Sequence, residues 1–569
     1  MAVKKKSKKK VLSAAEKQQR AEQSAHKRVV RGALGSLGFQ RVAGFSDKEL
    51  TFQGTTSDFD DLFIWKNIWV LTEYTTSSSG LSEHAKKKWF LYEKIISDQA
   101  AFIEDLCVNF AVVEAARDPQ FPKEKIVIKF LYCSKKDVAQ SLKDQLPKMH
   151  FFDYPIAMYF KAVAASVRYS GRPEFLHYLG VGYKEAGDQC LLTSGVPKIP
   201  FEGSVLPDAH SNLGKKLKVV SFYISPGALL DRAFVLRKDG WRDSDWLYQR
   251  MISPKKIAAI RSFLRRKQRV FLNNMIVTLP ADTRIVDEND DPIDSSKIST
   301  TQPARVLLPQ EFNSVGLIDG QHRIYSYHEG GKFDHDIAPL RNKLNLLVTG
   351  VLYPKGLSEA DRTKFEAEIF LEINSTQTGA SSEVKQVITT LLNPFDPDAI
   401  AKRVLTRLDR SGALERKFLS YFYDKERVKT TSVVSYGLRH LVNPQSAASL
   451  FHRWTHASKS VLLAGEDLEL LQDYVDYCFM RTNEWFLALK KQIGDSRWTY
   501  DKKVADHALN ATNVIGMINC FRAVVRNGDK LQLADFEKHL VGVEKFGFKS
   551  YKSSQYGAMG KAMYAKFYP

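Results

Sequence analysis

The stretch Gly316–Tyr325 (GLIDGQHRIY) predicts a strand, a tight turn and a helix, and it limits the possible fold of this chain more than any other stretch. A short apolar run ends in an acid and a glycine, and polar or charged side chains then fall on the first turn of the expected helix. Gly320 permits a tight turn and the close approach of a ligand, because it has no Cβ. The free amides at a helix N-terminus attract anions, and Gln321, His322 and Arg323 add side-chain donors around the same point. The pattern predicts a phosphate cradle, with an ordinary surface corner as the alternative.

A second motif follows downstream at Phe370–Gln377 (FLEINSTQ), of the form F-x-x-I-N-x-x-Q. The Asp-Gly-Gln-His-Arg turn and this segment, in this order, resemble the DGQHR-domain (DndB-like) family, which is itself similar to the ParB/sulfiredoxin superfamily. The resemblance covers about residues 215–440. It implies a ParB-like α/β domain that binds the phosphates of a nucleotide, in a bacterial DNA-modification or anti-phage defence system.

The same resemblance implies roles for individual residues. Asp319, His322 and Arg323 are the expected catalytic residues of a slow NTP hydrolysis, with Asp319 positioning water or a metal. The nucleotide, ATP or another NTP with Mg²⁺, is expected to contact the remaining residues of the motifs: Gly320, Gln321, Arg250, Asn374 and Gln377. From the residues alone, Asn374 is equally suited to capping a helix and Gln377 to shaping a turn.

Length and composition bound the remaining possibilities. At 569 residues the chain is expected to form two to four domains. No apolar run approaches the roughly eighteen residues of a membrane span, which predicts a protein without a membrane segment. The five cysteines form no C-x-x-C pair, as expected for a reducing cytoplasm: Cys107, Cys133, Cys190, Cys478 and Cys520.

The formal net charge of +20 favours an acidic partner such as DNA. Residues 1–31 hold eleven Lys or Arg against two acids, which is 11 − 2 = +9. Such a block is typical of a disordered basic arm, which can also follow a nucleic-acid backbone.

A β-hairpin around Lys66-Asn67 is predicted by the two aromatic and β-branched runs that flank it. If Trp65 pairs with Ile68, then Asp60 lies opposite Glu73 on one sheet face, where two carboxylates can hold a divalent metal. The arrangement resembles restriction-endonuclease-like nucleases, which place Glu-x-Lys on the second strand. This chain has Thr75 at the lysine position, so either the site is degenerate or a lysine comes from the next helix: Lys86, Lys87, Lys88 or Lys94.

A basic helix is predicted from Ser253-Pro254, a serine N-cap with proline at the first helical position. It carries seven bases and no acid, so it is either a solvated face or a contact to DNA phosphates. The expected DNA-binding residues are Lys255, Lys256, Arg261, Arg265, Arg266, Lys267 and Arg269.

The predicted fold class is α+β and multidomain. The expected order is a basic disordered arm (1–31), a restriction-endonuclease-like α/β domain (32–150), a helical linker (151–215), a DGQHR ParB-like α/β domain (216–395) and a mostly α-helical C-terminal domain (396–569).

The leading functional hypothesis is a nucleotide-binding, NTP-hydrolysing, DNA-associated cytoplasmic protein. The alternatives are a DNA-binding transcriptional regulator without turnover, and a Mg²⁺-dependent nuclease acting through Asp60 and Glu73. DNA and the partner proteins of a modification or defence operon are the expected partners, and a homodimer is expected from the frequent dimerisation of ParB-like domains.

Overall fold

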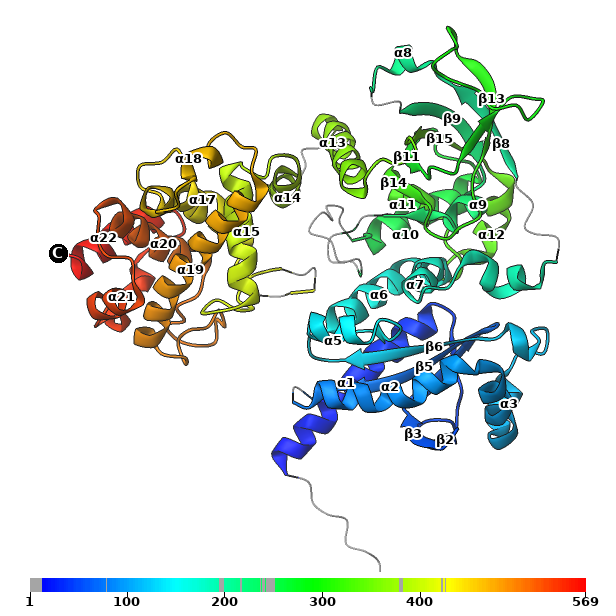
Figure 1. Ribbon diagram of the computed structural model, residues 1–569, viewed down its shortest axis with the longest axis horizontal. Helices are drawn as coiled ribbons and strands as arrows, with labels where there is room; N and C mark the ends of the chain where they lie inside the picture. The colour runs from blue at the N-terminus through cyan, green and yellow to red at the C-terminus, as the bar shows by residue number, and fades with distance from the viewer. Residues whose placement is uncertain are drawn as a thin grey trace, which may run out of the picture. The chain divides into compact units, whose positions relative to one another are not determined.

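A computed structural model describes residues 13–77, 79–193, 199–214, 217–235, 237, 241, 251–377, 382–420, 423–424 and 426–569. The described chain forms two compact units, which Figure 1 traces from blue to red. The first unit runs to residue 241 and continues from Met251 to Ser358, and the helical unit begins at Glu359. The architecture is mixed α+β with separate sheets and a helical C-terminal region, as predicted.

The first sheet has five strands in the order β1-β4-β5-β6-β7. Their bounds are β1 Gln40–Arg41, β4 Asp61–Trp65, β5 Ile68–Thr75, β6 Val127–Ser134 and β7 His150–Phe151. The β4–β5 hairpin pairs Trp65 with Ile68, and β5 pairs with β6 in parallel. The predicted hairpin register is confirmed, and it sets Asp60 beside Glu73.

Smaller elements surround this sheet. The bounds are β2 Lys48–Phe52, β3 Thr55–Phe59, α2 Leu81–Ser97, α3 Gln99–Asn109, α4 Ala111–Ala116 and α5 Gln140–Gln145. Helix α2 buries Leu91 and Ile95 on one side and carries basic residues on the other, so its pattern is amphipathic. It brings a lysine-rich turn close to the hairpin.

Helix α1 (Ala14–Ser36) corrects the prediction of a disordered arm over residues 1–31. A capping box begins it: Ser13 Oγ accepts from the Glu16 amide, and Glu16 Oε2 accepts from the Ser13 amide. Val30 packs in the core, while Lys27 and Arg31 pair with hairpin carboxylates. These two bases therefore have carboxylate partners within the fold. Residues 1–12 of the predicted arm lie outside the described residues.

The predicted linker at 151–215 is largely part of the core. Helices α6 (Tyr154–Val167) and α7 (Arg172–Tyr178) pack together through Phe160 and Phe175. The predicted helical linker also contains strand β8 (Pro200–Val205). Gly203 permits this, because a Cβ there would lie 2.1 Å from the Ser221 carbonyl oxygen of the neighbouring strand.

The second sheet has eight strands in the order β10-β14-β11-β15-β9-β8-β13-β12. The remaining bounds are β9 Lys218–Ile224, β10 Ala233–Phe234, β11 Met275–Leu279, β12 Arg284–Val286, β13 Gln302–Leu307, β14 Val315–Asp319 and β15 Leu346–Leu352. Its helices are α8 Asp208–Ser211, α9 Pro226–Leu230, α10 Pro254–Lys267, α11 Gln321–Tyr325 and α12 Asp334–Lys343. Buried residues of the two sheets and of α6 and α7 form one continuous core.

The helical unit has its own core, in which Trp485 and Phe521 stack. Its helices are α13 Glu359–Gln377, α14 Ser382–Leu392, α15 Pro397–Arg410, α16 Thr430–Val433, α17 Arg439–Val442, α18 Lys459–Leu462, α19 Leu468–Ile493, α20 Ala511–Arg526, α21 Leu533–His539 and α22 Tyr556–Phe567. The two units divide at Ser358–Glu359, ahead of the predicted boundary at residue 395.

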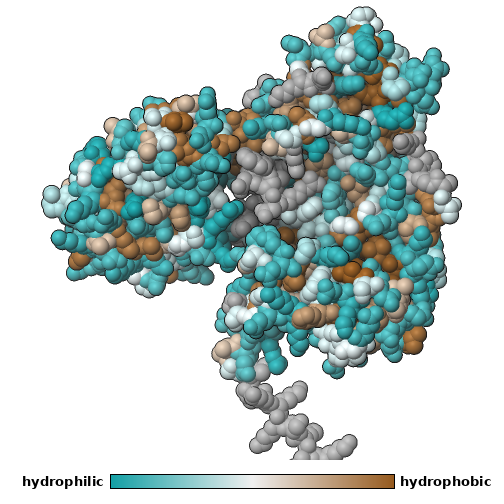
Figure 2. Space-filling view, viewed as in Figure 1, coloured by the Kyte–Doolittle hydropathy of each residue, from teal (hydrophilic) through white to brown (hydrophobic). Residues whose placement is uncertain are grey.

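The surface of both units is mainly hydrophilic on the face that Figure 2 shows. Large exposed hydrophobic residues are spread along the sequence, for example Phe90, Leu272 and Val541. Among the described helices, none combines the length and the apolar character that crossing a membrane requires.

Candidate functional site

The turn at Asp319–Arg323, called the turn site below, lies at the carboxyl end of β14, where Gly320 joins the strand to α11. Gly320 has a φ of +102°, which L side chains rarely adopt, and a Cβ there would lie 2.8 Å from Met275 Cγ. Glycine is therefore required by both the backbone and the neighbouring side chain. The predicted strand–turn–helix is confirmed, although α11 has five residues.

His322 lies where the N-termini of two helices meet. Its Nε2 atom accepts a 3.1 Å hydrogen bond from the backbone amide of Ser253, the N-cap of α10. Burial, followed by the positive charges of Lys256 and Arg237, lowers the pKa of His322 to about 4. The imidazole is therefore neutral at pH 7, and the groups that surround it favour an anion.

Arg323 and Gln321 complete the turn site. Arg323 Nη2 lies 2.7 Å from Asp319 Oδ2, and the two side chains are 17% and 38% exposed. Gln321 Oε1 is buried and has no hydrogen-bond partner among the described residues. A phosphate at this point must share Arg323 with Asp319, and Gln321 offers an acceptor to a hydroxyl or amino group of a ligand.

The structure does not describe the side chains of three predicted nucleotide contacts. Arg250 lies outside the described residues. Asn374 and Gln377 fall within α13, whose helical backbone continues to Gln377, and their side chains are not described. The interpretation of Asn374 as a helix cap is therefore wrong, because the residue lies inside the helix.

The basic helix α10 separates into structural and exposed bases. Arg261 is buried and donates to the carbonyl oxygens of Ser326, His328 and Lys332. Its predicted role in DNA binding is therefore wrong, because its guanidinium is buried and already donates to backbone carbonyl oxygens. The other six predicted bases are exposed, and one of them, Arg265, lies 3.6 Å from Asp336 of α12.

A second group of candidate residues, called the hairpin site below, comprises Asp60, Glu73 and Lys88. Lys88 of α2 is buried, and its Nζ lies 2.9 Å from Glu73 Oε2 and 2.8 Å from Asp58 Oδ1. Burial alone would lower the pKa of Lys88, but Glu73 and Asp58 raise it overall, so the lysine is charged. Among the four lysines considered for the place of Thr75, Lys88 is therefore the one in position.

The ionised form of Asp60 is destabilised by burial and by the nearby charge of Glu73. Burial and the neighbouring Glu73 raise the pKa of Asp60 to about 6, although Lys27 and the Tyr74 amide lower it. Its Oδ1 lies 2.5 Å from Lys27 Nζ, and its Oδ2 accepts from the Tyr74 amide at 2.7 Å. Two acids in a partly dehydrated space fit a divalent cation, provided that Lys27 moves away from Oδ1.

The hairpin site offers two carboxylates to a metal ion. No group of three or more His, Cys, Asp or Glu side chains forms a metal cluster within the described ranges. Mg²⁺ is commonly held by one or two carboxylates, with waters and substrate phosphates as its other ligands. The donor set therefore matches Mg²⁺ and does not match a structural zinc site.

Sequence reasoning missed Arg237 and Lys27. Arg237 is fully buried, where its Nη1 donates to Tyr159 Oη and Glu174 Oε2, and its charge reaches His322. Lys27 comes from a helix that was expected to be disordered. Neither residue has a local sequence signal, because each meets its partners through the tertiary fold.

In comparisons with known proteins, no family model, no curated protein and no solved structure matches the chain. The DGQHR resemblance therefore remains a prediction from the two motifs, and the function must be argued from the geometry of the turn site and the hairpin site.

Proposed function

We propose that the protein binds nucleotides and associates with DNA, and that the turn site holds the phosphates of ATP or another NTP. The DGQHR resemblance implies that this activity belongs to a bacterial DNA-modification or anti-phage defence system. The observation that carries the proposal is the meeting of two helix N-termini at His322, with Lys256, Arg237 and Arg323 nearby. Positive helix ends and cations around a neutral imidazole form an environment that stabilises phosphate.

Hydrolysis requires the Asp319–Arg323 ion pair to open. Arg323 then moves to a phosphate oxygen, where its guanidinium neutralises developing charge, and Asp319 becomes free to orient a water molecule or Mg²⁺. The pair thus keeps both groups in place until a phosphate competes for the arginine. A slow hydrolysis fits a site in which Arg323 is paired with Asp319 and the histidine is neutral.

DNA is proposed to bind along the exposed bases of α10, next to the turn site. Lys255 and Lys256 lie in the first turn of this helix, and Arg266 and Lys267 in its last. Contacts of this kind release counterions, so binding should weaken steeply with salt. Because Ser253 caps α10 and also donates to His322, DNA on the helix and phosphate at the turn share one structural element.

The test is phosphate release from ATP, GTP and CTP, with and without duplex DNA. Arg323→Ala should lower the release at least tenfold, because it removes the arginine of the turn that is proposed to neutralise the developing charge. Arg284→Ala, an exposed arginine on β12, is the matched control and should match wild type. Release that persists unchanged in Arg323→Ala rejects the turn as the catalytic site. DNA binding with no release by any variant favours the regulator without turnover.

A second proposed activity is Mg²⁺-dependent DNA cleavage at the hairpin site. One observation favours it: Lys88 Nζ lies 2.9 Å from Glu73 Oε2. Lys88 therefore provides the lysine that this chain lacks at position 75, where it has threonine. The expected result is nicking of supercoiled plasmid that needs Mg²⁺ and is lost in Glu73→Gln and Lys88→Met. Glu104→Gln, an exposed glutamate on α3, is the control. Equal cleavage by wild type and all three variants would contradict the proposal and would indicate a contaminating nuclease.

A further inference from the structure

The first unit contains a cavity of about 710 Å³, apart from the turn site and the hairpin site. The turn between β4 and β5 and the helices α7, α9 and α12 contribute to its lining, so segments far apart in the sequence enclose it. The volume falls within the range of small-molecule sites. The charges and aromatic rings of the lining therefore decide which kind of molecule fits.

The basic side chains described in this lining are paired with carboxylates: Lys66 with Asp188, Arg172 with Glu329, and Arg341 with Asp334. The Arg172 guanidinium also lies over the Trp65 ring, 4.2 Å from the ring centroid, and donates to the carbonyl oxygen of Leu37. An anionic ligand would have to break one of these pairs, so the lining does not favour an anion.

Asp231, which follows α9, is a further acid of the lining. Within the described ranges its carboxylate accepts no hydrogen bond and forms no ion pair. The guanidinium of Arg232, its neighbour in sequence, donates instead to two backbone carbonyl oxygens. Solvent in the cavity reaches Asp231, yet burial and then the charge of Glu329 raise its pKa to about 6, although Arg232 and Arg172 lower it. At pH 7 the carboxylate is therefore mostly ionised, and a cation in contact with it would be stabilised.

Polar and aromatic groups near Asp231 indicate the rest of the ligand. Burial and then the charge of Asp231 raise the pKa of Tyr183, so the Tyr183 hydroxyl lies within electrostatic reach of the carboxylate. Phe312 packs edge-on against Tyr183 with 5.0 Å between the ring centroids, and both rings line the cavity. Gln189 lines it as well, and its buried Oε1 has no hydrogen-bond partner among the described residues. A cation with N–H groups suits both oxygens, and the rings suit an apolar body.

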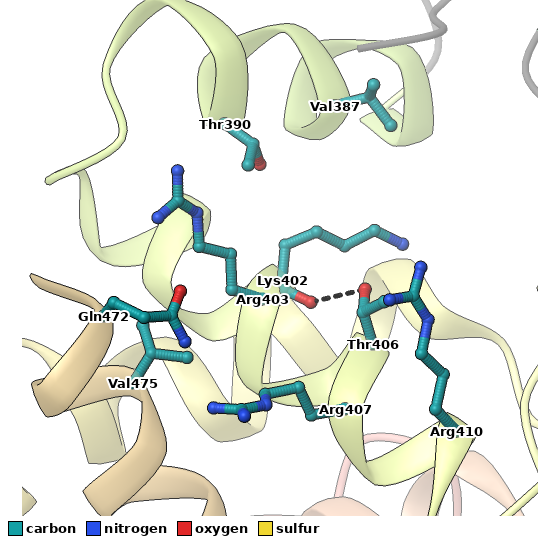
Figure 3. A pocket seen from close by; sticks show the side chains of 9 residues that line it. All are labelled: Val387, Thr390, Lys402, Arg403, Thr406, Arg407, Arg410, Gln472 and Val475. Carbon is teal, nitrogen blue, oxygen red and sulfur yellow. Dashed lines mark hydrogen bonds between the residues drawn. The ribbon is translucent and has the colours of Figure 1, made fainter. Parts of the chain in front are cut away.

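The helical unit presents a different case in the cavity of about 380 Å³ between α14, α15 and α19, which Figure 3 shows. Each base of α15 in its lining already has an interaction partner in the molecule, as Arg407 has in Asp476. These charges are met within the fold, and we infer no ligand for that cavity.

We propose that the cavity of the first unit binds a small organic cation, whose ammonium group pairs with Asp231 and whose apolar or aromatic body contacts Tyr183 and Phe312. The ammonium supplies the positive charge that the lining bases, held in their own pairs, do not bring to Asp231. A hydrogen bond between charged groups is about twice as strong as one between neutral groups, so a neutral molecule of the same shape should bind more weakly. The inference does not depend on nucleotide binding at the turn site.

Calorimetric titration of the full-length protein tests the proposal with two amines, tryptamine and phenethylamine, and with their neutral alcohol analogues, tryptophol and phenethyl alcohol. At pH 7 wild type should bind at least one amine about tenfold or more tightly than its alcohol. Asp231→Asn keeps the shape of the side chain and should remove that preference. Asp282→Asn is the matched control, because the Asp282 side chain in the same unit is 79% exposed, and it should bind both probes as wild type does.

A second variant tests the cavity without changing its charge. Ala338→Phe fills the cavity from α12, so it should weaken the binding of amines and alcohols alike, and it carries the test if Asp231→Asn lowers the Tm. Amine binding that both variants leave unchanged overturns the proposal, and so does the absence of saturable binding of either amine by wild type. Tighter binding of indolepropionate, an anion of similar shape, would also overturn it, because the lining bases would then have left their pairs for the ligand.

Discussion

The turn site and the hairpin site both place a carboxylate beside a cation at a strand end of the first unit, yet their electrostatics are opposite. At the hairpin, two acids from paired strands meet, and burial with mutual repulsion raises the pKa of Asp60. At the turn, burial and surrounding cations lower the pKa of His322. The hairpin site is therefore arranged for a cation, and the turn site for an anion.

The adjacent acids Asp60 and Asp61 differ in the number of hydrogen-bond and ion-pair partners that their carboxylates have. Asp61 is fully buried and accepts from Arg31, Ser46 and Tyr74. Asp60 has Lys27 and one backbone amide, and it faces another acid. Asp61 therefore stabilises the fold, whereas Asp60 is held at a cost, which is the usual condition of a functional residue.

The largest expected effect is that of Asp61→Ala. It leaves the Arg31 guanidinium and the Tyr74 hydroxyl without their shared acceptor, and it should cost about 3–5 kcal/mol of unfolding free energy. Denaturation with urea measures the loss. Asp47→Asn is the control, because Asp47 is 69% exposed, lies 3.7 Å from Lys27 and has a φ of +56°, which asparagine tolerates, so it should change stability by less than about 0.5 kcal/mol. Equal losses would show that burial does not distinguish these acids.

Gly320→Ala comes next, with an expected loss of about 1–3 kcal/mol from the positive φ and from the contact with Met275. It should also weaken ATP binding at the turn site at least tenfold, because the Cβ displaces the backbone that surrounds the phosphate. Gly356→Ala is matched in φ, at +89°, but has no neighbour within 4 Å. It should lose stability and keep ATP binding. If Gly320→Ala binds ATP as wild type does, the turn is not a cradle.

These contrasts also mark what the sequence could and could not predict. Hairpin register follows from the two-residue alternation of strands, so Asp60 opposite Glu73 was predictable once Trp65 was paired with Ile68. The strand–turn–helix at Gly320 was predictable from local residue types. The hydrogen bond from Ser253 to His322 spans 69 residues, and no spacing rule fixes contacts of that range. The burial of Arg261 was missed for the same reason, since its partners are backbone carbonyls of a distant loop.

Asp60→Asn removes one of two acids that repel each other, and it also removes the carboxylate partner of Lys27. The first effect is expected to be the larger one, so the substitution should raise the free energy of unfolding by about 1 kcal/mol at pH 7. The pH dependence has a definite sign. Asp60 keeps its proton up to about pH 6 in the folded state and releases it near pH 4 when unfolded, so wild-type stability falls as the pH rises between these values. In Asp60→Asn this fall should be reduced. Parallel Tm curves of the two proteins from pH 4 to 7 would contradict the assignment.

The smallest expected effect is proton uptake at His322 when ATP binds. A phosphate beside the imidazole should raise its pKa from about 4 toward the ordinary value, so protons are taken up on binding near pH 5.5. The uptake should stay well below one proton per ATP, because a proton on Nε2 faces the Ser253 amide that now donates to that atom. Calorimetry in buffers of different ionisation enthalpy measures the uptake, and His322→Gln removes the part due to the imidazole. Equal uptake by the two proteins would place the bound phosphate away from His322, and the anion-attracting surroundings of the turn would then serve the fold alone.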